Sequence, residues 1–498
     1  MAASSTHPPS KRTAATLAAL GLALLALAVW GLRTDMVWVS QAFYAYAWWA
    51  WILLLDAFCV WRRGSSLLTT RRHLLGLLAT SSVTFWFLFE ALNLRFENWY
   101  YIGTFQLGGP LTYLGAGSFV VAAFSTVFIG MFEAFDALGA AGILTRRGQP
   151  RRLPTWLPTG LQVLGLVMAG LAVAFPFYLA PLVWGSLTFL LDPWNYKRGN
   201  RSLLRDFEAG DGRAVARLFL AGLISGLVWE SLNFAAPQKW VYTVRGLEGL
   251  KLFEMPLLGF LGFPALAFDA VTAFSLLSYY LCGNLGWEHA DDLAAPARAH
   301  PGGAGDAGES GQAGLTGDAT RALVGAGVLR RYWRTVPLQA VFWVVVTAAM
   351  MPRTIGSIRL RLEHLPALAS APAGTAGPST LQVLEAEDIR WPRQLLRALA
   401  EESRADELAG RLGWDVAERE AVTRQTELYL FKGIGAVHGR FLGDVGVHAV
   451  ADLAAWEPEQ LHRELVRVAA DRGFAGPHLD WVRVWVLASR SRGVLMRG

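Results

Sequence analysis

Long apolar runs separated by short polar loops dominate the first two thirds of the chain. A helix of about 20 apolar residues is long enough to cross roughly 30 Å of hydrocarbon at about 1.5 Å per residue. We therefore predict an all-α, polytopic membrane helix bundle for this part of the chain. The expected spans cover residues 14–32, 43–61, 74–94, 111–138, 157–175, 177–193, 214–235, 256–282 and 336–352.

Two stretches about 140 residues apart carry the same order of polar and aromatic residues. In each stretch an apolar helix ends in Glu-x-Leu-Asn, and a Trp-x-Tyr follows about ten residues after the Glu. We predict a duplicated four-span unit over residues 1–140 and 141–287, with its copies related by a pseudo-two-fold axis along the membrane normal. The matched residues are Glu90, Asn93, Trp99 and Tyr101 in one copy and Glu230, Asn233, Trp240 and Tyr242 in the other.

The pattern changes after the eighth span. Residues 288–335 are mostly rich in Ala, Gly and Asp and predict a flexible loop, which leads to a ninth membrane helix at 336–352. A linker at 353–380 follows. Residues 381–498 are rich in Arg, Glu and Asp, and their apolar residues recur at helical spacing, so we predict a soluble helical domain there.

Charge distribution predicts how the spans are oriented. Arg and Lys concentrate in the loops after the second, fourth and sixth spans, so the positive-inside rule places the N-terminus in the cytoplasm. We expect a multi-pass protein of a bacterial-type inner membrane. Nine crossings would put residues 381–498 outside the cytoplasm, but the arginines on both sides of 336–352 leave that side open. These loop residues account for the net charge of +6, and we do not expect nucleic-acid binding.

Two carboxylates are expected inside apolar helices, where a charge costs at least ~2.5–3.5 kcal/mol unless it has a partner or faces a cavity. Asn93 and Asn233 follow Glu90 and Glu230 by three residues, on the same helix face, where an amide can donate to the carboxylate. Two interpretations are open. Each pair ties its helix to the Trp-x-Tyr loop, or the two glutamates meet in a central cleft and exchange protons.

Asp269 is a third intramembrane acid, near the middle of the eighth span, without a counterpart in the fourth. It is either a pocket residue or the acceptor of an interhelical hydrogen bond. All nine histidines lie outside the apolar runs, so we expect neither haem nor a histidine-based zinc site within the bilayer. The sequence has no Gly-rich phosphate loop, and we predict no cofactor and no metal.

The C-terminal domain carries Phe-Lys-Gly-Ile-Gly at 431–435, then Gly-Val at 446–447 and Asp-Leu-Ala at 452–454. This order resembles helix-hairpin-helix families of unknown function. In DNA-binding members of that motif the turn frees backbone amides for a phosphate. For this chain the resemblance implies that a partner or a phosphate is contacted by Lys432, Gly433, Gly435 and Arg440. The same glycines also serve simply to turn the chain, and the surrounding charges are mixed, so we expect a protein partner for 381–498.

The second half also places Glu254-Met255-Pro256 after its Trp-x-Tyr. This order resembles membrane-bound lycopene cyclases of the two-subunit type, which implies an enzyme acting on a polyisoprenoid.

Three functions follow from the sequence. The first is a scaffold or accessory protein whose C-terminal domain binds a partner. The second is a membrane-embedded enzyme acting on a lipid or polyisoprenoid through Glu90 and Glu230, with Asp269 in its pocket. The third is a small-solute permease.

Overall fold

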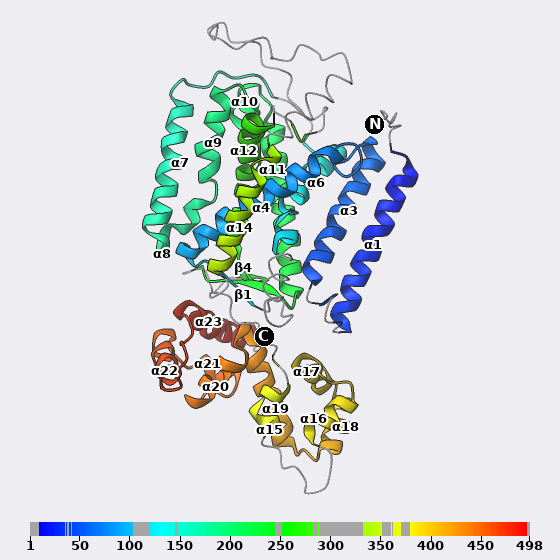
Figure 1. The fold of residues 1–498 in the computed structure, drawn as a ribbon, viewed down its shortest axis with the longest axis vertical. Coiled ribbons are helices and arrows are strands. Elements are labelled where there is room, and N and C mark those ends of the chain that lie inside the picture. Colours follow the sequence, from blue (N-terminus) through cyan, green and yellow to red (C-terminus); the bar gives the residue numbers. More distant parts are fainter. Residues whose placement is uncertain are drawn as a thin grey trace.

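Helices dominate the computed structural model, and seven of those it describes are long and apolar enough to cross a membrane. They form an elongated bundle, and the C-terminal helices lie together at one end of it (Figure 1). This agrees with the predicted membrane helix bundle. The structure describes residues 9–34, 36, 39–40, 42–102, 120–144, 148–244, 251–282, 286–288, 332–350, 360, 362–369 and 379–495.

The first three membrane helices follow the predicted spans closely, and the fourth covers the second half of its predicted span. They are α1 (Lys11–Arg33), α3 (Phe43–Arg63), α4 (Leu75–Phe96) and α6 (Val127–Ala140). Helix α3 ends where Gly64 adopts a φ of 66°, a left-handed conformation that glycine reaches without a steric penalty. The start of the predicted fourth span, residues 111–119, lies outside the described residues. So does most of the predicted flexible loop, residues 289–331.

The next helices depart from the prediction at one place. Helices α7 (Leu157–Ala174), α11 (Gly212–Ala235) and α12 (Gly262–Leu281) match expected spans. The predicted sixth span, 177–193, is not one helix. It is divided among α8 (Pro176–Leu179), the 3-10 turn η2 (Ala180–Val183) and α9 (Ser186–Lys197). Pro181 has no N–H to donate and Gly185 adopts a φ of 85°, so a continuous helix is interrupted there.

The two sets of membrane helices pack in the same order. Helix α1 packs on α3 as α7 packs on α9, and α3 packs on α6 as α9 packs on α12. Helix α4 contacts α6, and α11 likewise contacts α12. Across the bundle, α11 packs on α6 and α4 contacts α12. The core between these helices is strongly aromatic, with fully buried side chains that include Trp48, Phe87, Phe128, Phe132 and Phe274.

Two short strands join the ends of α4 and α11. Strand β1 (Trp99–Ile102) pairs antiparallel with β2 (Lys239–Tyr242), with Tyr100 opposite Val241 at the centre. On either side of this centre, Trp99 lies opposite Tyr242 and Tyr101 lies opposite Trp240. Aromatic and β-branched residues favour extended backbone, and the pairing satisfies the backbone amides and carbonyls of the two strands. A second small ladder joins β3 (Lys251–Leu252) to β4 (Met255–Pro256), which leads through η3 (Leu257–Leu261) into α12.

Helix α14 (Val336–Met350) lies along α4 and runs in the same direction. Thr80 bonds to Tyr332 near the start of α4, and one turn later Thr84 donates to Gln339 at 2.5 Å and accepts from Trp343 at 2.9 Å. This helix has 15 residues and is shorter than the seven long spans. It ends at Met350, on the side of the bundle that carries β1 and β2.

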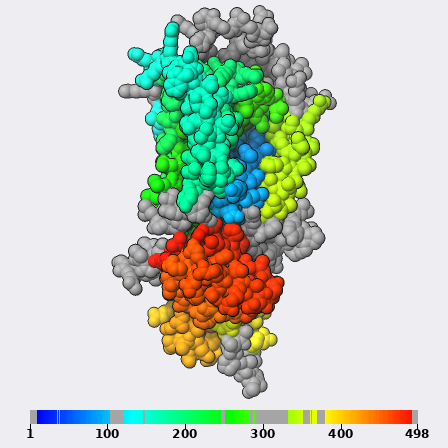
Figure 2. Space-filling view, turned by 90° about the vertical axis from the view of Figure 1, so that its left-hand side faces the viewer, coloured from blue at the N-terminus to red at the C-terminus, as the bar shows by residue number. Residues whose placement is uncertain are grey.

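The C-terminal helices surround a second hydrophobic core, in which Leu395, Leu465 and Trp485 are fully buried. Tyr100, Ile102 and Val241 of the paired strands belong to this core as well. The space-filling view shows them packed against one end of the membrane bundle (Figure 2). Pro392 and Pro458 occupy first turns, and Asp415 caps its helix by accepting from the Glu418 amide at 2.7 Å. The helices are η6 (Leu362–His364), α15 (Pro366–Ala369), α16 (Thr380–Ala386), α17 (Pro392–Ala400), α18 (Glu402–Leu412), α19 (Val416–Leu430), η7 (Phe431–Gly433), α20 (Gly435–Asp444), α21 (Val450–Leu453), α22 (Pro458–Asp471) and α23 (Leu479–Leu495).

Replacing Gly165 tests the close packing of α7 on α9. A Cβ at this position would lie 2.6 Å from the Leu190 amide nitrogen and 2.8 Å from the Ser186 carbonyl oxygen. Gly165→Ala should therefore lower the free energy of unfolding by about 1–3 kcal/mol, the usual cost of overpacking. Gly170→Ala, in the same helix with open space around it, is the control. Thermal unfolding of both variants in detergent measures the difference, and equal midpoints would contradict the packing.

Candidate functional site

Glu90 is buried near the end of α4 and accepts three hydrogen bonds on one oxygen. Its Oε1 accepts from the indole nitrogens of Trp86 at 3.0 Å and Trp99 at 3.3 Å, and from the hydroxyl of Tyr101. Its side chain is 1% exposed. Among the described residues, the buried Oε2 has no hydrogen-bond partner. The helix carboxylate and the strand that follows it are thus held together.

Glu230 has matching surroundings at the end of α11. Its Oε1 accepts from the Tyr242 hydroxyl at 2.7 Å, and the Trp240 indole donates to that same hydroxyl at 2.8 Å. Glu230 is fully buried. Each glutamate therefore bonds to the tyrosine of its own Trp-x-Tyr strand, which is the contact that the first of the two sequence interpretations requires.

The two asparagines hold the strand backbones. Asn93 donates to the Trp99 carbonyl at 2.9 Å and accepts from the Asn98 amide at 2.9 Å. Asn233 donates to the Trp240 carbonyl at 3.0 Å and accepts from its amide at 3.1 Å. We predicted that these amides donate to the carboxylates. Asn233 does so only at 3.5 Å, because its amide group already bonds to the backbone of Trp240.

An aromatic cavity of about 440 Å³ lies beside the paired strands, between the two halves of the bundle. The rings of Trp86 and Trp229, one from each half, contact each other in its wall, with centroids 5.3 Å apart. Leu258 and Leu261, at its rim, are 63% and 58% exposed. The tyrosines of both Glu–Tyr pairs belong to the lining, whereas the glutamates lie behind them. The lining includes Trp86, Trp99, Tyr101, Trp184, Trp229, Trp240, Tyr242, Met255, Leu258, Leu261, Phe263 and Ala265.

Asp269 is placed outside this cavity lining. Its Oδ2 accepts from the Gly185 amide at 2.9 Å, and its Oδ1 accepts from the Thr188 amide at 2.7 Å and hydroxyl at 2.6 Å. The carboxylate therefore caps the start of α9, where the interrupted span leaves amides without intrahelical partners. These contacts are those of an interhelical tie, the second of its two predicted roles.

A buried charge cluster joins the membrane bundle to the C-terminal domain. Glu254 is 1% exposed and lies between two lysines, with Lys239 Nζ 2.7 Å from Oε1 and Lys432 Nζ 2.6 Å from Oε2. Burial alone would raise the pKa of Glu254, but the charges of Lys432 and Lys239 outweigh it and lower the pKa below its ordinary value. The Lys432 carbonyl also accepts from Tyr100 of β1 and from Trp485, both at 3.2 Å.

The residues predicted to bind a partner or a phosphate take different positions. Lys432 is in the interface with Glu254, and Gly433 and Gly435 adopt φ values of 81° and 65° in the turn that presents it. Arg440 lies exposed on the next helix. The sequence did not predict the ion pair between Lys432 and Glu254 of the membrane bundle. Glu254 stands out in the sequence only as part of the Glu254-Met255-Pro256 segment.

Replacing Glu254 should weaken the docking of the C-terminal domain. Glu254→Gln leaves two lysines without their shared counter-charge, and breaking a buried ion pair typically costs about 3–5 kcal/mol. Glu420→Gln, at the exposed pair with Arg424, is the control and should change stability by less than about 1 kcal/mol. Hydrogen exchange at residues 99–102 and 479–485 reports docking. Equal protection in both variants would contradict the role of the cluster.

Docking should also depend on pH in the acid range. Because the docked pKa of Glu254 is depressed, its stabilising contribution is complete above its ordinary pKa of 4.5. That contribution is lost as the pH falls through the lower, docked pKa. Protection measured between pH 7 and pH 3 should therefore be constant at first and decline only below 4.5 in the wild type. Glu254→Gln should lack this decline.

Comparison with known proteins assigns only the C-terminal part. Residues 375–491 match the model of a family described as Domain of unknown function (DUF4332). The match covers most of the predicted soluble helical region and includes the turn at residues 431–435. No curated protein and no solved structure matches the chain. The C-terminal region is therefore a domain of unknown function joined to a helical membrane bundle.

Proposed function

We propose that the chain is an integral membrane protein that binds one apolar, lipid-like molecule in the aromatic cavity. The cavity itself carries this proposal. Its volume falls within the ~300–1,000 Å³ of ligand pockets, and an apolar lining with a few polar groups is typical of such sites. The hydroxyls of Tyr101 and Tyr242 supply polar groups, and the exposed leucines at the rim lie where hydrocarbon would surround the bundle.

The proposal includes the duplicated four-span unit, which equivalent contacts support. Besides the Glu–Tyr and Asn–strand contacts, a carboxylate near the opposite end of each half accepts from the loop that follows it. Asp56 accepts from Ser66 and from the Leu68 amide, both at 2.9 Å. Asp192 accepts from Ser202 at 3.0 Å and from the Leu203 amide at 2.8 Å. A two-fold axis through Tyr100 and Val241 would relate the halves, because each strand pairs with its own counterpart.

We further propose that β1, β2 and the C-terminal domain lie on the non-cytoplasmic side of an inner membrane. The alternation of basic loops supports this orientation. Helix α14 runs parallel to α4 and ends on the same side of the bundle as β1 and β2, which supports a ninth crossing. A protein partner for residues 381–498 remains part of the proposal. The docked domain still exposes large apolar side chains, with Val416 65% and Phe474 58% exposed.

Filling the cavity tests the binding proposal. Ala265→Trp places a large ring against the cavity wall, whereas Leu166→Trp replaces a side chain that is 64% exposed on α7. Lipid that copurifies with the protein, measured by native mass spectrometry, should fall at least fivefold in Ala265→Trp and remain unchanged in Leu166→Trp. Equal occupancy in the two variants would show that the cavity holds no such molecule.

The enzymatic alternative makes a different prediction for the glutamates. Glu90→Gln with Glu230→Gln keeps one carbonyl oxygen at each site to accept from the tyrosine, so a binding protein should retain both fold and bound lipid. Glu90→Leu instead leaves three buried donors without an acceptor. It should lower the free energy of unfolding by about 1–3 kcal/mol for each unsatisfied group. Mass spectrometry of the bound lipid distinguishes a binding protein from an enzyme. A change in the mass of the bound lipid in the double Gln variant would favour an enzyme.

A further inference from the structure

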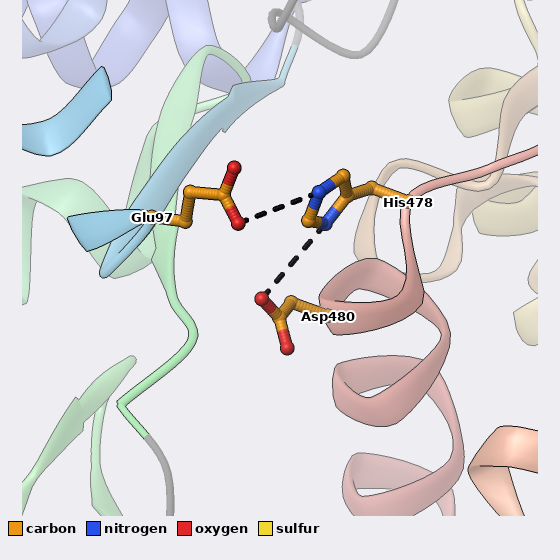
Figure 3. A group of neighbouring side chains, drawn as sticks. All are labelled: Glu97, His478 and Asp480. Atoms are coloured by element: carbon orange, nitrogen blue, oxygen red, sulfur yellow. Dashed lines mark ion pairs between the residues drawn. The ribbon is translucent and has the colours of Figure 1, made fainter. Parts of the chain in front are cut away.

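Three polar side chains from distant parts of the sequence meet where the C-terminal domain contacts the end of α4. Glu97 follows α4, and His478 and Asp480 lie at the start of α23, with the imidazole next to both carboxylates (Figure 3). His478 Nε2 lies 3.4 Å from Glu97 Oε2, and Nδ1 lies 3.8 Å from Asp480 Oδ2. We propose that these residues bind one divalent cation of the Zn²⁺ class.

The donor set and its spacing fit such a cation. One ligand atom from each of the three residues lies within 4.8 Å of the others. Imidazole nitrogen and carboxylate oxygen are common Zn²⁺ ligands, and bonds of about 2.1 Å in a tetrahedral site place ligand atoms about 3.4 Å apart. The two carboxylates contact different nitrogens of the imidazole, Glu97 at Nε2 and Asp480 at Nδ1, and a cation binds only one of these. Bringing one ligand atom from each residue from within 4.8 Å to the tetrahedral spacing requires a shift of the side chains of about 1–2 Å, and leaves a fourth position for water.

Surrounding contacts already hold the ligands in place. Glu97 adopts a φ of 55°, which is uncommon for a residue with a Cβ, and its carbonyl accepts from the Thr243 hydroxyl. Asp480 Oδ1 accepts from Arg483 at 3.0 Å, which orients Oδ2 toward His478. Arg483 is fixed in turn by Glu459 at 2.7 Å. Outer hydrogen bonds of this kind are typical of metal sites, where they orient the ligands.

An independent observation comes from the hollow that these residues line. It measures about 150 Å³, and Glu90 lies on its wall together with Glu97, His478 and Asp480. Glu90 Oε2 is the buried oxygen without a hydrogen-bond partner among the described residues. Buried polar atoms are rarely left in that state, and a hollow of this size has room for ordered water. A water bound to the cation would have Glu90 as an acceptor within the same hollow.

The proposed site also joins two parts of the protein. Glu97 belongs to the membrane bundle, and the other two ligands belong to the C-terminal domain, so the cation would add to the Glu254 cluster in holding them together. This inference is independent of lipid binding in the aromatic cavity. It differs from the sequence prediction of no metal, which rested on the absence of histidine from the apolar runs and did not consider pairing between the two parts.

Titration of the full-length protein in detergent tests the inference. Protein stripped with a chelator is titrated with Zn²⁺ in competition with a chromophoric chelator. The wild type should bind one equivalent per chain. His478→Ala and Asp480→Asn should each weaken binding at least tenfold. His448→Ala, which removes another exposed histidine of the same domain, should leave the affinity unchanged.

Hydrogen exchange supplies a second measurement. Zn²⁺ should slow amide exchange at residues 96–102 and 478–484 in the wild type and in His448→Ala, but not in His478→Ala. Absence of Zn²⁺ binding by the wild type would overturn the proposal and leave the cluster as an ion-pair network. Wild-type affinity in a correctly folded His478→Ala variant would overturn it as well.

Discussion

The membrane bundle depends on one constraint: polar groups at the ends of its central helices must find partners within the protein. Hydrocarbon offers no hydrogen bonds, so a carboxylate or an open amide there is costly. The antiparallel pairing of β1 with β2 meets this constraint for the backbone. Tyr101 and Tyr242 meet it for the two carboxylates, Glu90 and Glu230. The strands, the glutamates and the tyrosines are therefore parts of a single hydrogen-bonded unit.

The same unit determines where the C-terminal domain can attach. The central residue of β1, Tyr100, donates to the Lys432 carbonyl, and the Lys432 ammonium pairs with Glu254. The residue after Glu254 is Met255, which lines the aromatic cavity. The residue that the domain contacts is therefore the neighbour in sequence of a residue in the cavity wall. In the proposed function, docking of the domain at Glu254 would restrict the movement of Met255 and so of that part of the wall.

Much of the membrane part could be predicted from the sequence, because the thickness of the bilayer sets the length of an apolar helix. The Glu-x-Leu-Asn and Trp-x-Tyr patterns also identified the residues that bond to one another. The sequence prediction runs a single span through Pro181 and Gly185, although both residues disfavour a continuous helix. That Asp269 caps the restarted helix could not be predicted, because it comes from a different helix. Nor could the partners of Lys432 and His478, since these depend on how parts far apart in the sequence meet rather than on local periodicity.

The differences between the proposed copies change which rings line the aromatic cavity beside the strands. Trp86 precedes Glu90 by four residues, and the matching position before Glu230 is Gly226. A Cβ at Gly226 would lie 2.3 Å from the Phe263 ring. The Phe263 ring of α12 therefore packs against Gly226, whereas the matching position of the other half carries the indole of Trp86. Conversely, Trp229 matches Phe89 and extends to contact Trp86. Matched positions in the proposed copies thus carry rings of different size, and the cavity beside the strands is lined by an asymmetric set of aromatic side chains.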